Sequence, residues 1–581
     1  MANPTVPEIL TGLVRRAIAA AGLGNGDDPI DPVVASNKPQ FGDYQSNHAF
    51  RVGKANGLNP RAAGQKIHDH LPEHPAIAKT AVAGPGFINF FIDDDWLCGH
   101  IIEMVGDEHL NLPQSGAGKT LVIDYSSPNI AKRMHIGHMR STIIGNTMLR
   151  LHQAAGWNTV ADNHIGDWGT PIGKIIVAWK GWRDEDNLAA DPIGELERLY
   201  VSFGQKAEND DTLIEQAREE TARLQAGDPE NRALWQRFLE ISGIERDDIY
   251  NRIGATFDVT LGESFYNDML AGVVEDLLKH DVATISDGAV IVQFPEDAQP
   301  KMLRETTVVI RKADGAALYA TTDLATLEYR MKEYAPDRIL YLTGREQQLH
   351  FQQFFAAWNQ LRAARGVEDT ASPELIHLWF GMLKVDGAIP STRRGGTIRL
   401  AELLDKAVEE ARKVVEDASP ELSGEEKDHV ASVVGVNTIR YFDLSQNPQS
   451  TVNFEWARAL SLQGNTAPYM MYAVARIRSI QRKAGVEAAL SNLAITNPKE
   501  RALLIQLLKL PDAITAALET QRPNLLCEYL YEVAGMLNSF YAVSRVLGSD
   551  EQASRLAFIE AVARVLEYGL DLLGIRTLER M

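Results

Sequence analysis

The pattern of apolar and polar positions is clearest between residues 120 and 169. TLVIDY at 120–125 is a short apolar run rich in β-branched and aromatic residues, which predicts a buried strand. Apolar residues then recur at helical spacing over 135–156, and TVADNHIGDWG at 159–169 predicts a second strand that ends in a turn. A strand, a helix and a second strand in this order are typical of a parallel βαβ unit.

The N-terminal segment, residues 1–115, has a different pattern. It alternates helical and extended stretches around two turn-rich signals, NKPQFGDY at 37–44 and AGPGFINFFI at 83–92. The second signal predicts a tight turn that opens an alternating strand. A Gly- and Ser-containing stretch at 111–119 then predicts a linker.

The remaining segments favour helices. Residues 186–285 are mostly charged and helical in pattern and predict an insertion, after which strand patterns return and continue to residue 344. From about residue 400 the pattern is helical almost throughout. Together these patterns predict an α/β protein with boundaries at 1–115, 116–400 and 401–581.

Composition narrows the classes of protein. The 581 residues carry a formal net charge of -20, which by itself argues weakly against nucleic-acid binding, because a large acidic protein can keep local basic patches. Only two cysteines occur, Cys98 and Cys527, which excludes a disulfide scaffold and a cysteine-rich zinc site. No uncharged apolar stretch approaches the ~20 residues that span a bilayer. We therefore expect a cytoplasmic protein without a membrane partner.

The strongest chemical signal is His135-Ile136-Gly137-His138, where a predicted strand passes into a predicted helix. A helix N-terminus presents unpaired N–H groups and the positive end of a dipole, so it suits phosphates. The same dipole favours neutral imidazoles that donate to ATP oxygens, and Gly137 leaves room for the adenosine. Two partly buried histidines at a helix end would give the same four letters, so the surrounding sequence must decide.

The surrounding sequence resembles that of arginyl-tRNA synthetases. The similarity covers VIDYSSPNIAKRMHIGHMRSTIIGN at 122–146 and continues, in the order of that family, to the C-terminus. The further similar blocks are FGDY and GPGFINF near the N-terminus, NHIGDWGTPIGK, DGAALYATTDLA, GREQQLHFQQFF, GMLKVDGAIPSTRRGGTIRLAELLDKA, GNTAPYMMYAVARIRSI and LLGIRTLERM. Residues 186–285 show the least similarity to that family.

The resemblance implies a fold and a reaction. It implies an N-terminal tRNA-binding domain, a Rossmann-like parallel-sheet catalytic domain and an all-α C-terminal anticodon-binding domain. Arginine would be activated with ATP, with Mg²⁺ on the phosphates, and the arginyl group would pass to the 2′-hydroxyl of the terminal adenosine of tRNA(Arg). It further implies a monomer whose arginine activation requires bound tRNA.

The second signature loop of this enzyme class would be residues 388–395. It departs from the usual pattern, because Ser391 stands where related loops commonly carry lysine. The resemblance implies that Lys132, just before the histidine motif, supplies the missing charge beside Arg393 and Arg394. Which cation meets the pyrophosphate stays open, and the two arginines alone would otherwise indicate a solvated loop.

Arginine recognition demands acceptors, because a guanidinium has five donors and no acceptor. Tyr319 and Asp323 lie four residues apart, which places them on one face of a helix if a helix begins there. The resemblance assigns them to the side-chain pocket. It also assigns Gln347, Asp124 and Asn129 to arginine and His350 to ATP. Taken singly, Asp323 could instead cap a helix, Tyr319 could be a core residue and Gln347 a surface residue.

The C-terminal third carries the predicted RNA contacts. Tyr469, Tyr472 and Arg476 have the spacing of one helical stripe, and RNA bases are commonly read by aromatic rings and arginine. A core tyrosine stripe is the alternative. The resemblance adds Tyr541 and Met581 as anticodon contacts, and Phe87 and Asn89 as contacts to the tRNA D-loop.

Three other functions fit part of these observations. A synthetase of the same class for another amino acid is possible in principle, but a cysteinyl enzyme needs a zinc-binding cysteine set that is missing here. A non-catalytic paralogue would have lost His135, His138 or Asp323. A nucleotidyltransferase with a similar histidine motif would not need the helical third.

Overall fold

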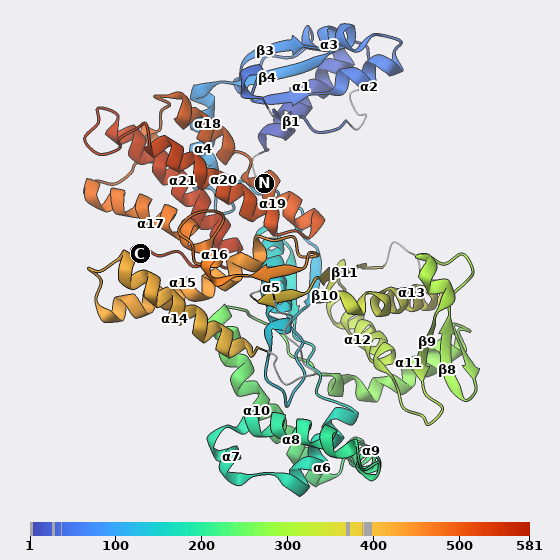
Figure 1. Ribbon diagram of the computed structural model, residues 1–581. Helices are drawn as coiled ribbons and strands as arrows, with labels where there is room; N and C mark the ends of the chain where they lie inside the picture. Colours follow the sequence, from blue (N-terminus) through green and yellow to red (C-terminus); the bar gives the residue numbers. More distant parts are fainter. Residues whose placement is uncertain (1–3, 26–29, 37, 368–371, 386, 388–397) are drawn as a thin grey trace. The chain divides into compact units, whose positions relative to one another are not determined.

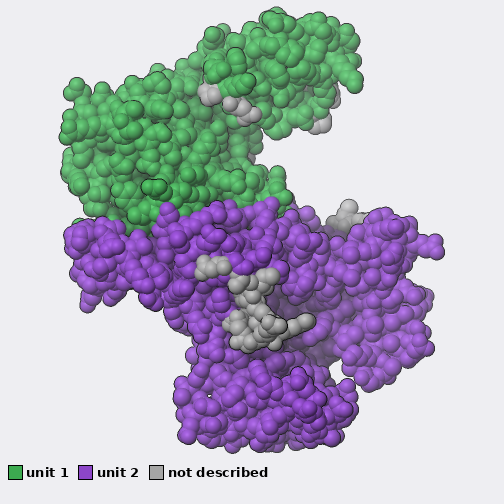
Figure 2. Space-filling model, in the orientation of Figure 1, with its two compact units in different colours: residues 1–115, 462–581 green, residues 116–461 purple. Residues whose placement is uncertain are grey.

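The structure is a computed structural model that describes residues 4–25, 30–36, 38–367, 372–385, 387 and 398–581. The chain forms two compact units. One unit contains residues 1–115 and 462–581, and the other contains residues 116–461 (Figure 2).

The second unit is built on a parallel sheet. Its strands are β5 (Thr120–Asp124), β6 (Asn158–Asp162), β10 (Arg338–Gly344) and β11 (Glu374–Phe380), in the order β11-β10-β5-β6. Every pairing is parallel, so the predicted βαβ unit is confirmed. Helices α5 (Ile136–Ala154), α12 (Tyr319–Tyr334) and α13 (Gln348–Ala364) accompany these strands. The order reverses between β5 and β10, and in open α/β sheets ligands bind at the carboxyl ends of such strands.

A helical insertion follows β6 and forms a separate cluster in Figure 1. Its helices are α6 (Thr170–Trp182), α7 (Glu185–Ala190), α8 (Pro192–Ala207), α9 (Thr212–Gln225) and α10 (Pro229–Ile253). Their apolar faces share a core that includes Trp179, Leu196 and Phe238. The helices therefore begin before residue 186, where the charged composition first suggested an insertion.

A smaller antiparallel sheet precedes α12. It consists of β7 (Ala283–Ser286), β8 (Ala289–Gln293) and β9 (Thr307–Arg311), with α11 (Leu270–Lys279) beside it. A 3₁₀ helix, η2 (Glu263–Met269), joins this part to the helical insertion. η2 also packs on α12, where the rings of Phe265 and Tyr266 contact Tyr329.

Residues 401–461 belong to the same compact unit as the parallel sheet. They include α14 (Leu400–Ala418), α15 (Gly424–Leu444) and α16 (Trp456–Ala459), while β12 (Leu383–Val385) pairs with β13 (Val452–Phe454). Two fully buried arginines join α15 to α5: Arg140 donates to Asp443 at 2.7 Å, and Arg440 donates to Asn146 at 2.5 Å. The boundary predicted at residue 400 thus falls inside this unit.

The first unit combines a small sheet with a helical bundle. The sheet has the order β1-β2-β4-β3 and is antiparallel, with strands Val34–Ala35, Tyr44–Ser46, Phe87–Ile92 and Ile77–Ala83 in that order. Its helices are α1 (Val6–Ala20), α2 (His48–Ala55), α3 (Pro60–His68) and α4 (Asp94–Gly106). The bundle contains α17 (Ala467–Ala484), α18 (Pro498–Leu507), α19 (Leu510–Thr520), α20 (Asn524–Tyr541) and α21 (Gln552–Leu572). Among the described residues, no helix has the length and apolar character needed to cross a membrane.

Candidate active site

The loop between β5 and α5 is strained and tightly held. Ser126, Ser127 and Ala131 all have positive φ, at 71°, 48° and 59°, which is unfavourable for residues other than glycine. Hydrogen bonds hold their backbone N–H groups: Ser126 donates to the Ser141 hydroxyl at 2.8 Å, and Ala131 donates to the Ser242 hydroxyl at 2.8 Å. Such strain persists only where the surroundings over-determine it, and it is common at functional sites.

The histidine motif begins α5, as the sequence predicts. The Nδ1 atom of His135 accepts from the Gly137 N–H at 3.0 Å, and the Nδ1 atom of His138 accepts from the His135 N–H at 3.1 Å. Both rings therefore carry their proton on Nε2, which remains the one donor of each neutral imidazole. A Cβ on Gly137 would lie 2.8 Å from the His135 ring, so glycine is needed there for the ring as well as for any ligand.

Both histidines are held in the neutral form. Burial lowers the pKa of His138 to about 3, with further lowering from His135 and Lys132. Burial, followed by the charge of Lys132, also lowers the pKa of His135. The rings lie 4.0 Å apart between centroids. Two neutral N–H donors at a helix N-terminus form a good site for phosphate oxygens.

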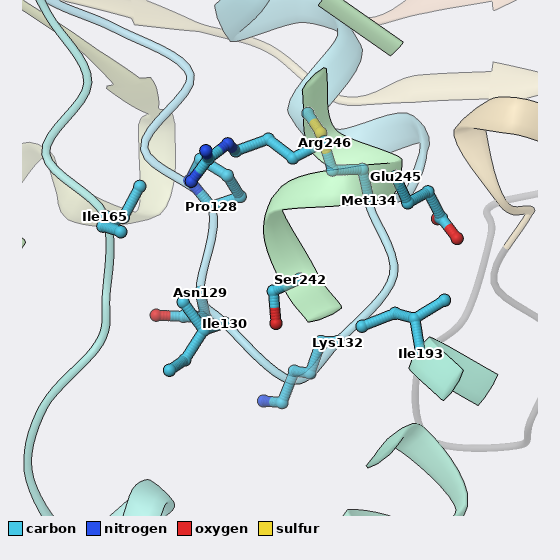
Figure 3. A pocket seen from close by; sticks show the side chains of 10 residues that line it. All are labelled: Pro128, Asn129, Ile130, Lys132, Met134, Ile165, Ile193, Ser242, Glu245 and Arg246. Atoms are coloured by element: carbon cyan, nitrogen blue, oxygen red, sulfur yellow. The ribbon is translucent and has the colours of Figure 1, made fainter. Parts of the chain in front are cut away.

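Lys132 lines a pocket beside this motif (Figure 3). The pocket is lined by Pro128, Asn129, Ile130, Lys132, Met134, Ile165, Ile193, Ser242, Glu245 and Arg246. The Lys132 Nζ atom lies over the ring of Tyr200, 4.1 Å from its centroid. Asn129 is exposed and packs on Gly166, where a Cβ would meet its Oδ1 atom at 1.9 Å. Lys132 and Asn129, both predicted site residues, therefore share one pocket.

The second signature loop lies outside the described residues, and with it Ser391, Arg393 and Arg394. The chain after it pairs directly with the histidine motif. Ile136 donates to the carbonyl of Ile398 at 3.1 Å, and Leu400 donates to that of Met134 at 2.9 Å. Residues 398–400 therefore lie beside His135, while the roles predicted for Arg393 and Arg394 stay predictions.

The predicted arginine pocket contains a histidine–aspartate pair. Tyr319 and Asp323 lie on the first turns of α12, whose N-cap is Leu318, so Asp323 is not the cap of this helix. His350 donates from Nε2 to Asp323 at 2.5 Å. Burial alone would lower the pKa of His350, but this bond and the Asp323 charge together raise it. The structure thus places His350 beside the carboxylate predicted to bind arginine, and the predicted contact of His350 with ATP stays a prediction.

Glu263 is a candidate site residue that no local pattern in the sequence indicates. It lies at the start of η2, and the charges of Asp167 and Asp323 reach it. Burial, followed by these two carboxylates, raises its pKa to about 8. Tyr319 is 66% exposed, and its pKa is raised by burial and then by Glu263. Tyr319, Asp323 and Glu263 therefore surround one acidic region, although no local spacing connects residue 263 with residue 323.

The other two predicted arginine contacts differ in their surroundings. Both oxygens of Asp124 have partners: Ser127 donates to one at 2.9 Å and the fully buried Arg330 donates to the other at 2.6 Å. Arg330 also donates to Asp162 at 2.8 Å and so links β5, β6 and α12. Gln347, by contrast, is exposed at the end of the short helix η4 (Arg345–Gln347).

Comparison with known proteins agrees with this site. The family described as "tRNA synthetases class I (R), catalytic domain" matches residues 100–456, the DALR anticodon binding domain matches 470–581, and the arginyl tRNA synthetase N terminal domain matches 8–92. The chain belongs to the arginyl-tRNA synthetase family. An arginine–tRNA ligase of Fusobacterium nucleatum is 43% identical over 95% of each chain, and one of Actinobacillus succinogenes is 40% identical over 99% of this chain and 100% of the relative. The crystal structure of arginyl-tRNA synthetase from Plasmodium falciparum has a TM-score of 0.83 at 25% identity and covers all of both chains.

The anticodon contacts predicted from the arginyl-tRNA synthetase resemblance lie on α17 and α20. Tyr472 is 49% exposed, while Arg476 lies over the ring of Tyr541 at 4.2 Å from its centroid. Tyr469 accepts a hydrogen bond from Asn538 at 2.8 Å and is partly buried. In this helical stripe Tyr469 therefore packs against its neighbours, whereas Tyr472 is exposed and is the most accessible ring. Met581 is partly buried at the C-terminus.

The two predicted D-loop contacts lie on β4 of the N-terminal domain. Phe87 is partly buried and its ring lies 5.1 Å from that of Phe50. Asn89 is only 1% exposed and accepts a hydrogen bond from Gln45 at 2.9 Å. Asn89 thus links β2 and β4 through Gln45, and its predicted contact with the tRNA D-loop stays a prediction.

Proposed function

We propose that the chain acts as an arginine–tRNA ligase by the two-step route of its family. In the first step the carboxylate of arginine attacks the α-phosphate of ATP and pyrophosphate leaves. In the second step the arginyl group passes from the adenylate to the 2′-hydroxyl of the terminal adenosine of tRNA(Arg), and AMP leaves. The observation that carries this proposal is that the unit built on the parallel sheet contains both an N–H-rich helix start at His135 and an acidic region around Asp323.

The phosphate side is formed by the first turn of α5. The Nε2–H groups of His135 and His138 donate to phosphate oxygens, and the helix N-terminus adds its positive dipole end. Lys132 contributes the cation that compensates charge on the leaving pyrophosphate. Little covalent chemistry is required of the protein, so the rate enhancement comes from positioning and from compensated charge.

The arginine side is formed by α12 and η2. Asp323 and Glu263 supply two carboxylates to a planar group that has only donors. Tyr319, which is exposed at the mouth of this region, covers the guanidinium with its ring. His350 fixes one oxygen of Asp323, which leaves the other oxygen for arginine. Asn129 and Gln347 are both exposed and would complete the contacts to the substrate.

Mg²⁺ would bind through ATP. In the described ranges, no group of three or more His, Cys, Asp or Glu side chains is placed to hold a metal ion. Mg²⁺ usually keeps several waters and binds to substrate phosphates with few protein ligands, so the site has no need of a protein cage. No step above depends on the ion.

The first unit would bind the tRNA. Tyr472 and the Arg476–Tyr541 pair are the surface that reads anticodon bases, and β4 of the N-terminal domain faces the D-loop. We further propose a cytoplasmic monomer.

ATP–pyrophosphate exchange tests the proposal. The protein is assayed with each amino acid in turn, with and without tRNA(Arg). We expect exchange with arginine only, and only when tRNA is present. Exchange with another amino acid would contradict the assignment of arginine as the substrate. Full exchange without tRNA would contradict only the proposed requirement for tRNA.

A further inference from the structure

We propose that Tyr200, on helix α8 of the helical insertion, is a positioning residue that holds the ammonium group of Lys132 beside the histidine motif. This inference rests on the proposed role of Lys132 in ATP activation. The direct observation is the placement of the Lys132 Nζ atom over the Tyr200 ring, 4.1 Å from its centroid. A cation within about 6 Å of an aromatic centroid is attracted by the negative face of the ring.

The pocket that Lys132 lines also contains a carboxylate. Glu245 lines it, and its Oε1 atom is buried and has no hydrogen-bond partner among the described residues. Its other oxygen, Oε2, accepts from Arg133 at 2.8 Å. Figure 3 shows the Lys132 side chain extending away from the Glu245 carboxylate. Without Tyr200, the ammonium group would gain most by turning to Glu245 Oε1.

The two partners would have different consequences for catalysis. A carboxylate would neutralise the ammonium group and compete with phosphate for it. An aromatic ring stabilises the cation and leaves its charge and its three donors available. Tyr200 therefore keeps Lys132 ordered and leaves its charge uncompensated until ATP arrives.

Electrostatic interactions connect Lys132 and Tyr200 with residues on both sides of the site. The charge of Lys132 reaches His135 and His138, where it adds to the lowering of both pKa values that burial begins. On the other side, Tyr200 adds to the raised pKa of Tyr319, after burial and Glu263. The neighbouring residue Arg133 is fixed by Asp191 and Glu245, both from the insertion. The insertion thus holds the backbone through Arg133 and the reactive cation through Tyr200.

The test compares two substitutions at Tyr200 in two backgrounds. Tyr200→Leu removes the ring, and Tyr200→Phe keeps it. Both are made in the natural chain and in Lys132→Met, and tRNA-dependent exchange gives kcat and KM for ATP and for arginine. We expect Tyr200→Leu to lower kcat/KM for ATP about tenfold, equal to ~1.4 kcal/mol, and Tyr200→Phe to stay within about twofold. In the Lys132→Met background, Tyr200→Leu should have no further effect.

Lys206→Met is the matched control. Lys206 lies on the same helix, over Trp182 at 5.0 Å from the ring centroid, and the variant should keep normal exchange. Equal damage from Tyr200→Phe and Tyr200→Leu would overturn the inference, as would additive loss in the Lys132→Met background. A silent Lys132→Met would overturn the role of Lys132 and the inference with it, while arginine-specific exchange by the natural chain would leave the proposed function standing.

Discussion

The proposed phosphate side and the proposed arginine side of the active site have opposite electrostatic character. The phosphate side combines neutral donors with a single cation: two histidines whose pKa values are lowered and a helix N-terminus, together with one lysine that lies over an aromatic ring. The arginine side relies on carboxylates, one paired with His350 and one with a pKa of about 8.

The difference follows from the substrates. The charge on the phosphates moves during adenylation, from the α-phosphate to the leaving pyrophosphate, and neutral N–H donors accommodate such a shift without fixed ion pairs. The guanidinium charge is permanent at any working pH, so the group that buries it must provide a compensating negative charge. Substitutions on the two sides should therefore affect different substrates.

The largest expected effect is that of Asp323→Asn on the arginine side. Asparagine has the size of aspartate but no charge. Its amide N–H groups would face the N–H groups of the guanidinium, which has no acceptor. Losing one partner of a buried charged pair costs about 2–5 kcal/mol. At 1.4 kcal/mol per decade this is roughly a 30- to several-thousand-fold loss in kcat/KM for arginine. KM for ATP is the internal control and should not change. A loss in kcat/KM for arginine smaller than about threefold would contradict the proposal that Asp323 compensates the charge of the guanidinium.

On the phosphate side, His135→Ala and His138→Ala should each slow adenylation. Removal of one preorganised donor typically costs about 100-fold or more in kcat. The Kd for tRNA should change little. Each substitution also removes a helix cap, so the control is Asp228→Ala, which removes the side-chain cap of α10. Normal exchange in either histidine variant would remove that histidine from the ATP site.

Lys132→Ala should slow adenylation more than Arg394→Ala. Hydrogen bonds to charged groups are worth about 1.5–3 kcal/mol, so the loss for Lys132 should be on the order of 10- to 100-fold. The measurement is single-turnover adenylate formation with tRNA bound. If Arg394→Ala proves more damaging, the charge that replaces the missing signature lysine comes from the loop and not from Lys132.

The smallest expected effect is a pH dependence of arginine binding. Glu263 has a raised pKa of about 8, so below that pH it is protonated in the free enzyme and must lose the proton to pair with the guanidinium. KM for arginine should therefore fall as pH rises, by up to about tenfold per pH unit, and level off above pH 8. Glu263→Gln should flatten this profile and leave KM for ATP unchanged. A profile that keeps its slope in Glu263→Gln would assign the titration to another group.

The raised pKa of Glu263 also affects the free energy of unfolding. Rising pH should strengthen arginine binding but weaken the contribution of Glu263 to folding. Because the folded state binds this proton more tightly than the unfolded chain does, the contribution of Glu263 to folding is fully present below about pH 4.5. It is lost as pH rises toward 8. Arginine binding, which favours the ionised carboxylate, should offset this loss.

Local patterns in the sequence were sufficient for the frame of the site. The β-branched run at 120–124, the helical spacing after it and the helix start at His135 depend on neighbours in the chain, and all three are confirmed. The i, i+4 spacing of Tyr319 and Asp323 likewise predicts their shared helix face, because one helical turn is a local property. The family resemblance, carried by contiguous blocks, is confirmed for the same reason.

Partnerships between distant segments were decided only by the tertiary structure. Glu263 reaches Asp323 because η2 packs on α12, Arg330 joins Asp124 to Asp162 across the sheet, and Tyr200 reaches Lys132 from a helix about 70 residues away. Asn89 lies in the strand that the pattern predicts, yet its side chain is taken by Gln45 on a neighbouring strand. Periodicity determines which face of an element a residue occupies, whereas the group it meets there depends on how the elements pack.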